Sequence, residues 1–122
     1  MFKEALREIV EKTDGGIAGL VMDSEGIALE SYSKDDAASS GIDITTVGVE
    51  YGVVYGSIKR AAQSLDAGGT SEVSIATDKM ITLIRSLGPT YFLALAIRPD
   101  GNFGKGRFLM RAAAPKLLAE LG

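Results

Sequence analysis

The segment between residues 43 and 65 constrains the fold more than any other part of the sequence. Its apolar residues recur at alternating spacings of three and four, which is typical of one face of an α-helix. Asp43 stands directly before them as an expected N-cap, and Gly68 and Gly69 follow as a stop. The pattern predicts a long helix with one buried face, made of Ile44, Val47, Tyr51, Val54, Ile58, Ala61 and Leu65.

The rest of the chain alternates between helical and extended patterns. Helical spacing over residues 2–10 is followed by two extended segments, 17–22 and 27–32, joined by the turn "DSEG". A polar connection, 33–41, precedes the long helix, and three extended segments follow it: 72–77, 80–87 and 90–98. A last helix is expected over 107–121, kinked or broken at Pro115. The order α-β-β-α-β-β-β-α predicts an α+β fold with a five-stranded antiparallel sheet sandwiched by helices.

Composition excludes several classes of function. The chain has neither His nor Cys, so thiolate nucleophiles, His bases and Cys/His zinc sites are excluded. Its net charge is −3 and no basic stripe appears, so nucleic acid is not expected as a partner. No window is long and apolar enough for a membrane span, and residues 1–13 form a charged amphipathic pattern with no apolar signal core. We expect one domain over residues 1–122, cytoplasmic, without membrane insertion, metal, cofactor or catalytic residues.

Two loops carry residues that resemble ligand sites. Asp23 and Glu25 in "DSEG" form a carboxylate pair, but no third ligand accompanies them, so an ordinary hairpin turn is the favoured interpretation. The loop at 99–106 leads to Lys105 and Arg107, which could hold an anion, yet it matches neither the Walker motif nor G-x-G-x-x-G. Nothing in the spacing selects an arginine finger from Arg85, Arg98, Arg107 and Arg111.

Three glycines at every fourth position of the long helix suggest an interface. Gly48, Gly52 and Gly56 are costly in a helix, and they are expected on a stripe beside the buried one, flanked by Tyr55 and Lys59. A second backbone could approach there, and a second copy of the same helix would supply it. The alternative is that the glycines pack against the chain's own sheet or a loop.

The extended segment "SEVSIAT" (71–77) gives a second reason to expect a homodimer. It is regular, carries few charges and should lie at one end of the sheet, where an unpaired edge has to be covered or paired. Pairing with its twin through Val73, Ser74 and Ile75 would join two five-stranded sheets into one and place the glycine-bearing helices side by side.

The order of elements, "GGIAGLVMDSEGIALES", the long second helix and "GRFLMRAAAPKLLAEL" together resemble the Roadblock (dynein light-chain Roadblock-type) family, a profilin-like α/β/α fold. The resemblance covers nearly the whole chain, and the closing helix is similar to that of bacterial and archaeal members of the MglB type. It implies a homodimer with a continuous ten-stranded sheet, whose paired second helices receive a small Ras-like GTPase. It also implies a structural role for "DSEG", since related chains carry N/D-x-E-G at this turn.

The resemblance leaves several functions open. The first is a non-catalytic homodimeric regulator or scaffold of a Ras-like GTPase, in cell polarity or motility, with a GTPase-activating effect that remodels the partner's switch regions without an arginine finger. The second is a nucleotide-independent assembly or tethering module of the dynein light-chain type. A small-ligand sensor ranks below both, because no polar cluster lies within the apolar strands to orient a ligand.

Overall fold

A computed structural model describes residues 2–34 and 41–121 of the chain, and it confirms the predicted order of elements. The three helices are α1 (Phe2–Lys12), α2 (Ile44–Ser64) and α3 (Phe103–Leu121). The strands are β1 (Gly16–Asp23), β2 (Ala28–Ser33), β3 (Glu72–Ala76), β4 (Ile81–Leu87) and β5 (Tyr91–Ile97). None of the helices in these two stretches is both long and apolar enough to cross a membrane.

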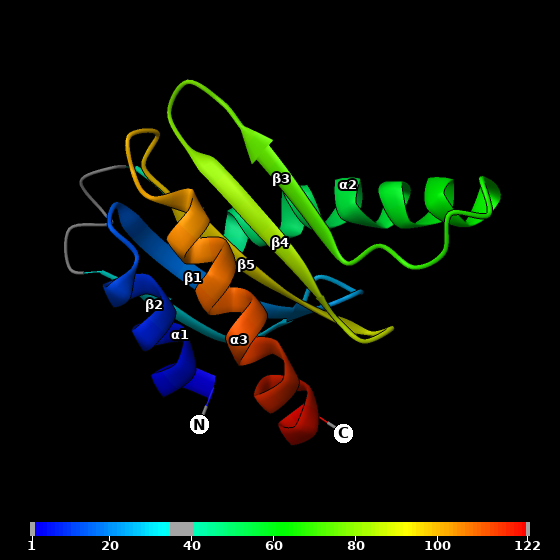
Figure 1. Ribbon diagram of the computed structural model, residues 1–122, viewed down its shortest axis with the longest axis horizontal. Coiled ribbons are helices and arrows are strands. Elements are labelled where there is room, and N and C mark those ends of the chain that lie inside the picture. The colour runs from blue at the N-terminus through cyan, green and yellow to red at the C-terminus, as the bar shows by residue number, and fades with distance from the viewer. Residues whose placement is uncertain (1, 35–40, 122) are drawn as a thin grey trace.

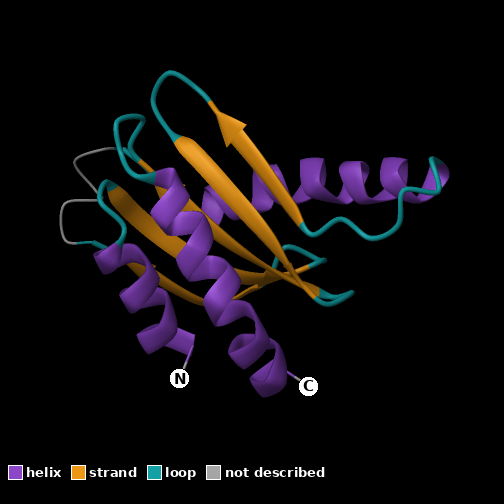
Figure 2. Ribbon diagram, in the orientation of Figure 1, coloured by secondary structure: helices purple, strands orange, loops and turns teal. Residues whose placement is uncertain are grey.

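The five strands form one antiparallel sheet in the order β2-β1-β5-β4-β3, covered by helices on both faces. Helices α1 and α3 lie side by side on one face, and α2 lies on the other (Figures 1 and 2). Strand β5 is central and nearly all apolar because it is buried on both faces, with Leu93 facing α1 and α3 and Ala94 facing α2. The edges of the sheet are β2 and β3.

Helix α2 begins where the sequence predicts. The Asp43 side chain accepts hydrogen bonds from the Thr45 backbone N–H (3.1 Å) and from the Thr46 hydroxyl (3.1 Å), so Asp43 is the N-cap. The helix starts behind the sheet and continues past the β3 edge, so that its C-terminal half extends beyond the sheet (Figure 1). That projection leaves part of the helix without support from its own sheet.

The predicted burial of α2 is therefore wrong in its second half. Val54 is 43% exposed, Leu65 is 78% exposed and Ala61 is also exposed. The fully buried residues of the helix are Ile44, Gly48 and Tyr55. The face that meets the sheet is rotated from the predicted apolar stripe toward the glycines.

The last helix differs from the expectation in its start and in its continuity. Helix α3 starts at Phe103, four residues earlier than predicted, because the Asn102 side chain accepts a hydrogen bond from the Lys105 backbone N–H and caps it. The helix continues without a break through Pro115. Most of the expected polar connection, residues 35–40, lies outside the described residues.

Candidate interaction surface

The turn "DSEG" is a structural element. One carboxylate oxygen of Asp23, Oδ1, accepts hydrogen bonds from the backbone N–H groups of Glu25 (2.9 Å) and Ile27 (3.0 Å). Gly26 follows with a φ of 85°, which a side chain would strain. Asp23 thus shapes the hairpin by the local bonding typical of Asp in turns, and the structural interpretation of this turn is confirmed.

The glycines of α2 do not form an outward stripe. A Cβ atom on Gly48 would lie 2.3 Å from Leu20 Cδ2, and one on Gly52 would lie 3.3 Å from the Phe92 ring. Both residues therefore face the chain's own sheet, which is the alternative that the sequence left open. Only Gly56 is different, because a Cβ there would meet nothing nearer than Arg60 Nη1 at 3.7 Å.

Tyr55 and Lys59 also turn inward. Tyr55 is 3% exposed and packs on Phe92 with 5.4 Å between ring centroids. The Lys59 ammonium lies 5.2 Å from the Tyr55 ring centroid and donates a hydrogen bond to the Pro89 carbonyl (3.4 Å). These contacts hold α2 against the β4–β5 turn, so of the five predicted residues on α2 only Gly56 remains open to a close approach from outside.

The uncovered part of α2 is apolar. Val54 and Leu65 are the exposed large side chains of the predicted stripe, Ile58 is half-buried between them, and Ala61 completes the spacing. We call these four residues the α2 stripe. Alternation of three and four residues is the spacing of helices that pair along a seam, as well as of a helix on a sheet. The sequence signal was thus correct about an apolar face and wrong about its burial in the second half of the helix.

Strand β3 presents an open edge beside this helix. The Ser86 N–H donates to the Ser71 carbonyl (3.0 Å) and the Thr77 N–H donates to the Met80 carbonyl (2.9 Å). Hydrogen-bonded and non-bonded pairs alternate along an antiparallel ladder, so Val73 and Ile75 also bond to β4. The backbone groups of Glu72, Ser74 and Ala76 consequently point away from the sheet.

The opposite edge, β2, is protected in ways that β3 is not. The register of β2 with β1 shifts between Val21 and Met22, so that Leu29 is left without a partner in a bulge. A charged side chain, Glu30, lies beside it and pairs with Lys3 (3.8 Å). Bulges and charges discourage strand addition, whereas β3 keeps an unbroken register with β4. Of the two edges, β3 is the one suited to pairing.

Two of the four candidate arginines are engaged in holding β3. Glu72 Oε2 lies 2.8 Å from Arg107 Nε, and Glu72 Oε1 lies 3.6 Å from Arg85 Nη1. All three side chains are a third exposed or less, so this cluster joins the edge strand to β4 and to α3. Arg85 and Arg107 are therefore structural residues of this chain.

Replacing Glu72 by Gln is expected to lower the free energy of unfolding by about 1 kcal/mol, because the charge-assisted contacts to both arginines weaken while the shape is kept. Urea denaturation at fixed protein concentration measures the change. Glu120→Gln on the exposed end of α3 is the matched control, and an equal effect of both variants would contradict the assigned role of the cluster.

On its other flank, α2 borders a small cavity. About 150 Å³ lies between Gly48, Val49, Gly52 and Val53 of the helix and the turn at 23–26. Pockets that enclose metabolites usually have about 300 Å³ or more. This cavity gives no support to the small-ligand function, and Val53, which is 69% exposed at its rim, is a surface residue that the sequence pattern did not single out.

Comparison with known proteins places the chain in a family. MglC from Myxococcus xanthus is 39% identical to it, over 96% of this chain and 96% of that one, with a TM-score of 0.68. The chain belongs to the Roadblock/LC7 family. No protein-family model matches the sequence, and no curated protein matches it.

Two less similar Roadblock/LC7 structures share the fold. A Roadblock/LC7 domain from Streptomyces avermitilis is 12% identical, with 95% of this chain and 97% of that one covered and a TM-score of 0.74. MglB solved with a tetrameric arrangement is 18% identical, with 95% and 84% covered and a TM-score of 0.80. At these identities they show the architecture alone, and the predicted Roadblock fold is confirmed.

Proposed function

We propose that this Roadblock protein acts as a homodimer, formed by the α2 stripe and the open edge of β3. The observation that carries the proposal is the exposed apolar end of α2: the helix projects past the β3 edge (Figure 1), and its C-cap residue, Leu65, is 78% exposed. A two-fold axis next to β3 would bring the projecting helix of each copy over the sheet of the other. Val73, Ser74 and Ile75 would pair with their twins, and Gly56 is the glycine left for helix contact.

We further propose that the dimer is a non-catalytic regulator or scaffold of a small Ras-like GTPase. Two relatives support a regulatory role of this type: MglC is 39% identical to the chain, and MglB shares its fold. That the partner is a GTPase is inferred from the resemblance to MglB-type members, in which the paired second helices bind a small Ras-like GTPase. An activating effect would act on the partner's switch regions, as the resemblance implies; of the four candidate arginines, Arg85 and Arg107 are already held by Glu72.

The alternative is a dimer that tethers other proteins without regard to nucleotide. The same surface supports it, because an apolar helix pair serves either role. The two functions differ in one measurable property: a regulator binds one nucleotide state of a GTPase, whereas a tether binds its partner equally in both.

The deciding experiment uses the full chain as bait in its native lysate, with GDP or with a non-hydrolysable GTP analogue. Mass spectrometry identifies the bound proteins. A Ras-like GTPase enriched with the analogue supports the regulator, and hydrolysis assays with the purified pair then test activation. Recovery of one non-GTPase partner equally in both conditions would favour the tether.

Leu65→Gln is expected to weaken self-association at least about tenfold, because each protomer loses the burial of one leucine side chain, about 1.5 kcal/mol or more. The folded protomer should be unaffected, since this side chain is exposed. Sedimentation velocity over a dilution series measures the change, and Ser64→Gln, one residue away on an exposed position outside the stripe, is the control. If the two variants dimerise alike, the stripe does not contribute.

A further inference from the structure

The face of the molecule opposite α2 carries an exposed aromatic residue on α3. Phe108 is 61% exposed, whereas the residues of α3 that meet the sheet, Gly106, Met110 and Leu117, are buried. The Lys105 ammonium lies 5.9 Å from the centroid of the Phe108 ring. Aromatic and cationic side chains that stand together at a rigid helix surface are typical anchors of protein interfaces.

The charge around Phe108 is positive although the chain as a whole is acidic. Helix α3 contains Lys105, Arg107, Arg111 and Lys116, and its only acidic residue is Glu120 near the end. Arg107 is neutralised by Glu72, but Lys105 and Arg111 form no ion pair with any residue in 2–34 or 41–121. They stand three residues before and after Phe108, so each is a neighbour of Phe108 on the helix surface, one on either side of it.

Helices α1 and α3 lie side by side (Figure 1), and the groove between them is lined on α3 by residues that begin directly after Phe108, at Leu109. It has about 140 Å³ of free volume and an apolar lining of Ala5, Ile9, Leu109, Ala112 and Ala113. Its acidic residue, Glu8, accepts a hydrogen bond from Lys12 (2.9 Å). That bond and the charges of Lys12 and Lys116 lower the pKa of Glu8 below its usual value. The one carboxylate that lines the groove, Glu8, is thus already paired with Lys12. The unpaired charges on either side of Phe108, those of Lys105 and Arg111, are positive.

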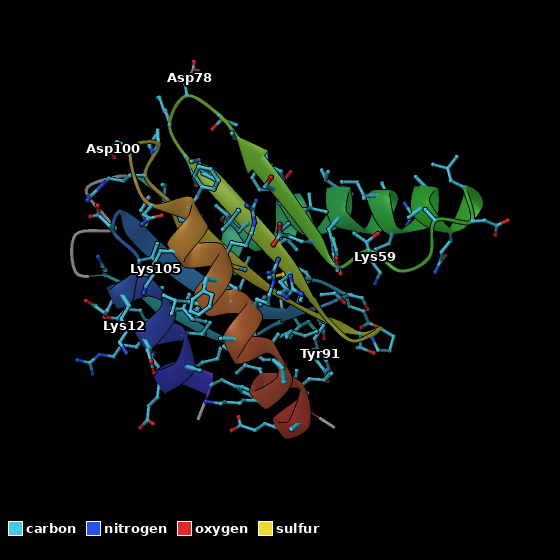
Figure 3. All side chains as sticks on the ribbon, viewed as in Figure 1. Lys12, Lys59, Asp78, Tyr91, Asp100 and Lys105 are labelled. Atoms are coloured by element: carbon cyan, nitrogen blue, oxygen red, sulfur yellow. The ribbon has the colours of Figure 1, made fainter. Side chains whose placement is uncertain are left out.

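We propose that this surface binds an amphipathic helix of a partner protein, with an apolar side chain in the α1–α3 groove and acidic side chains facing Lys105 and Arg111. Phe108 packs on the bound helix at the rim of the groove. Figure 3 shows Lys105 in front of the sheet on α3, whereas Lys59 extends from α2, so this contact and dimerisation through α2 occupy different faces. The protein would then join two kinds of partner, and the inference does not depend on a GTPase.

The charges favour an acidic helix over a membrane. Membrane-binding segments usually gather about four to eight Lys or Arg residues, whereas only two unpaired cations flank Phe108 here. The net charge of −3 would also oppose approach to an anionic bilayer. The groove, with about 140 Å³ of free volume and an apolar lining, has room for an apolar side chain of such a helix.

The test uses two labelled helical peptides of Leu and Ala, identical except that one carries Glu and the other Lys along one flank. Fluorescence anisotropy with the full chain is expected to show a preference of about tenfold or more for the Glu peptide, reduced by added salt. Phe108→Ala should weaken that binding about tenfold, and Lys105→Glu with Arg111→Glu should abolish the preference. Each substituted side chain is exposed, so the variants should keep the unfolding temperature of the parent chain.

Matched controls separate the surface from general charge and hydrophobicity. Phe103→Ala removes a second exposed aromatic, and Lys79→Glu in the β3–β4 turn reverses a remote charge, and neither should change binding. Equal binding of the two peptides, or full binding by Phe108→Ala, would overturn the proposal. So would sedimentation with phosphatidylserine vesicles that depends on Phe108 while the Glu peptide does not bind.

Discussion

Ser74→Pro is expected to give a folded protein that no longer dimerises at micromolar concentration. The Ser74 N–H points away from β4, so proline there removes no bond of the ladder within the chain. In the proposed dimer, however, the same N–H lies at the strand pairing, and the two-fold axis makes the loss occur twice. Two hydrogen bonds at about 1 kcal/mol each, with the steric effect of the ring, predict a dissociation constant at least about thirtyfold higher.

Sedimentation velocity measures that dissociation constant, and circular dichroism checks that the sheet persists. Ser74→Ala is the control, because it removes the side chain and keeps the backbone donor. An unchanged dimer in the proline variant would exclude β3 from the interface. A dimer lost equally in both variants would show that the side chain, not the strand edge, makes the contact.

Gly48→Leu is expected to destabilise the fold by about 3 kcal/mol, near the upper end of the usual cost of overpacking a core. The first added atom would lie 2.3 Å from Leu20 Cδ2 and 3.0 Å from Met22 Cε. Because α2 rests directly on β1 at this point, it would have to move away from the sheet to admit a side chain. Guanidinium denaturation at one fixed protomer concentration measures the change, since dimerisation also contributes to stability.

Gly56→Leu is the matched substitution on the same helix. A Cβ atom there meets only Arg60 Nη1 at 3.7 Å, and leucine favours a helix over glycine by up to about 1 kcal/mol. The protomer should therefore be as stable as the parent or more so. If Gly48→Leu and Gly56→Leu were equally harmful, the close approach of α2 to β1 would not be the cause.

Several local features could be predicted from the sequence because they depend on neighbours in the chain. Asp43 caps α2 and Asp23 bonds the backbone of its own turn, and both contacts span at most four residues. The start of α3 was missed for a related reason: the capping side chain of Asn102 lies in a segment rich in glycine, which indicated a loop. The positions of the five strands along the chain could also be predicted, because turn residues bound each apolar segment.

What the sequence by itself determined is the set of elements and the existence of an apolar face on α2. Only the tertiary structure decided which part of that helix meets the sheet. Apolar spacing shows that a side chain avoids water, but it does not show whether the chain or a second molecule provides the cover. Conversely, Gly48 carries no side chain to signal burial, yet it lies at the centre of the contact because only hydrogen fits between α2 and Leu20. The burial of Leu65 and the contact of Gly48 were therefore both predicted wrongly for one physical reason: where a helix lies on a sheet is set by long-range packing, which no local pattern records.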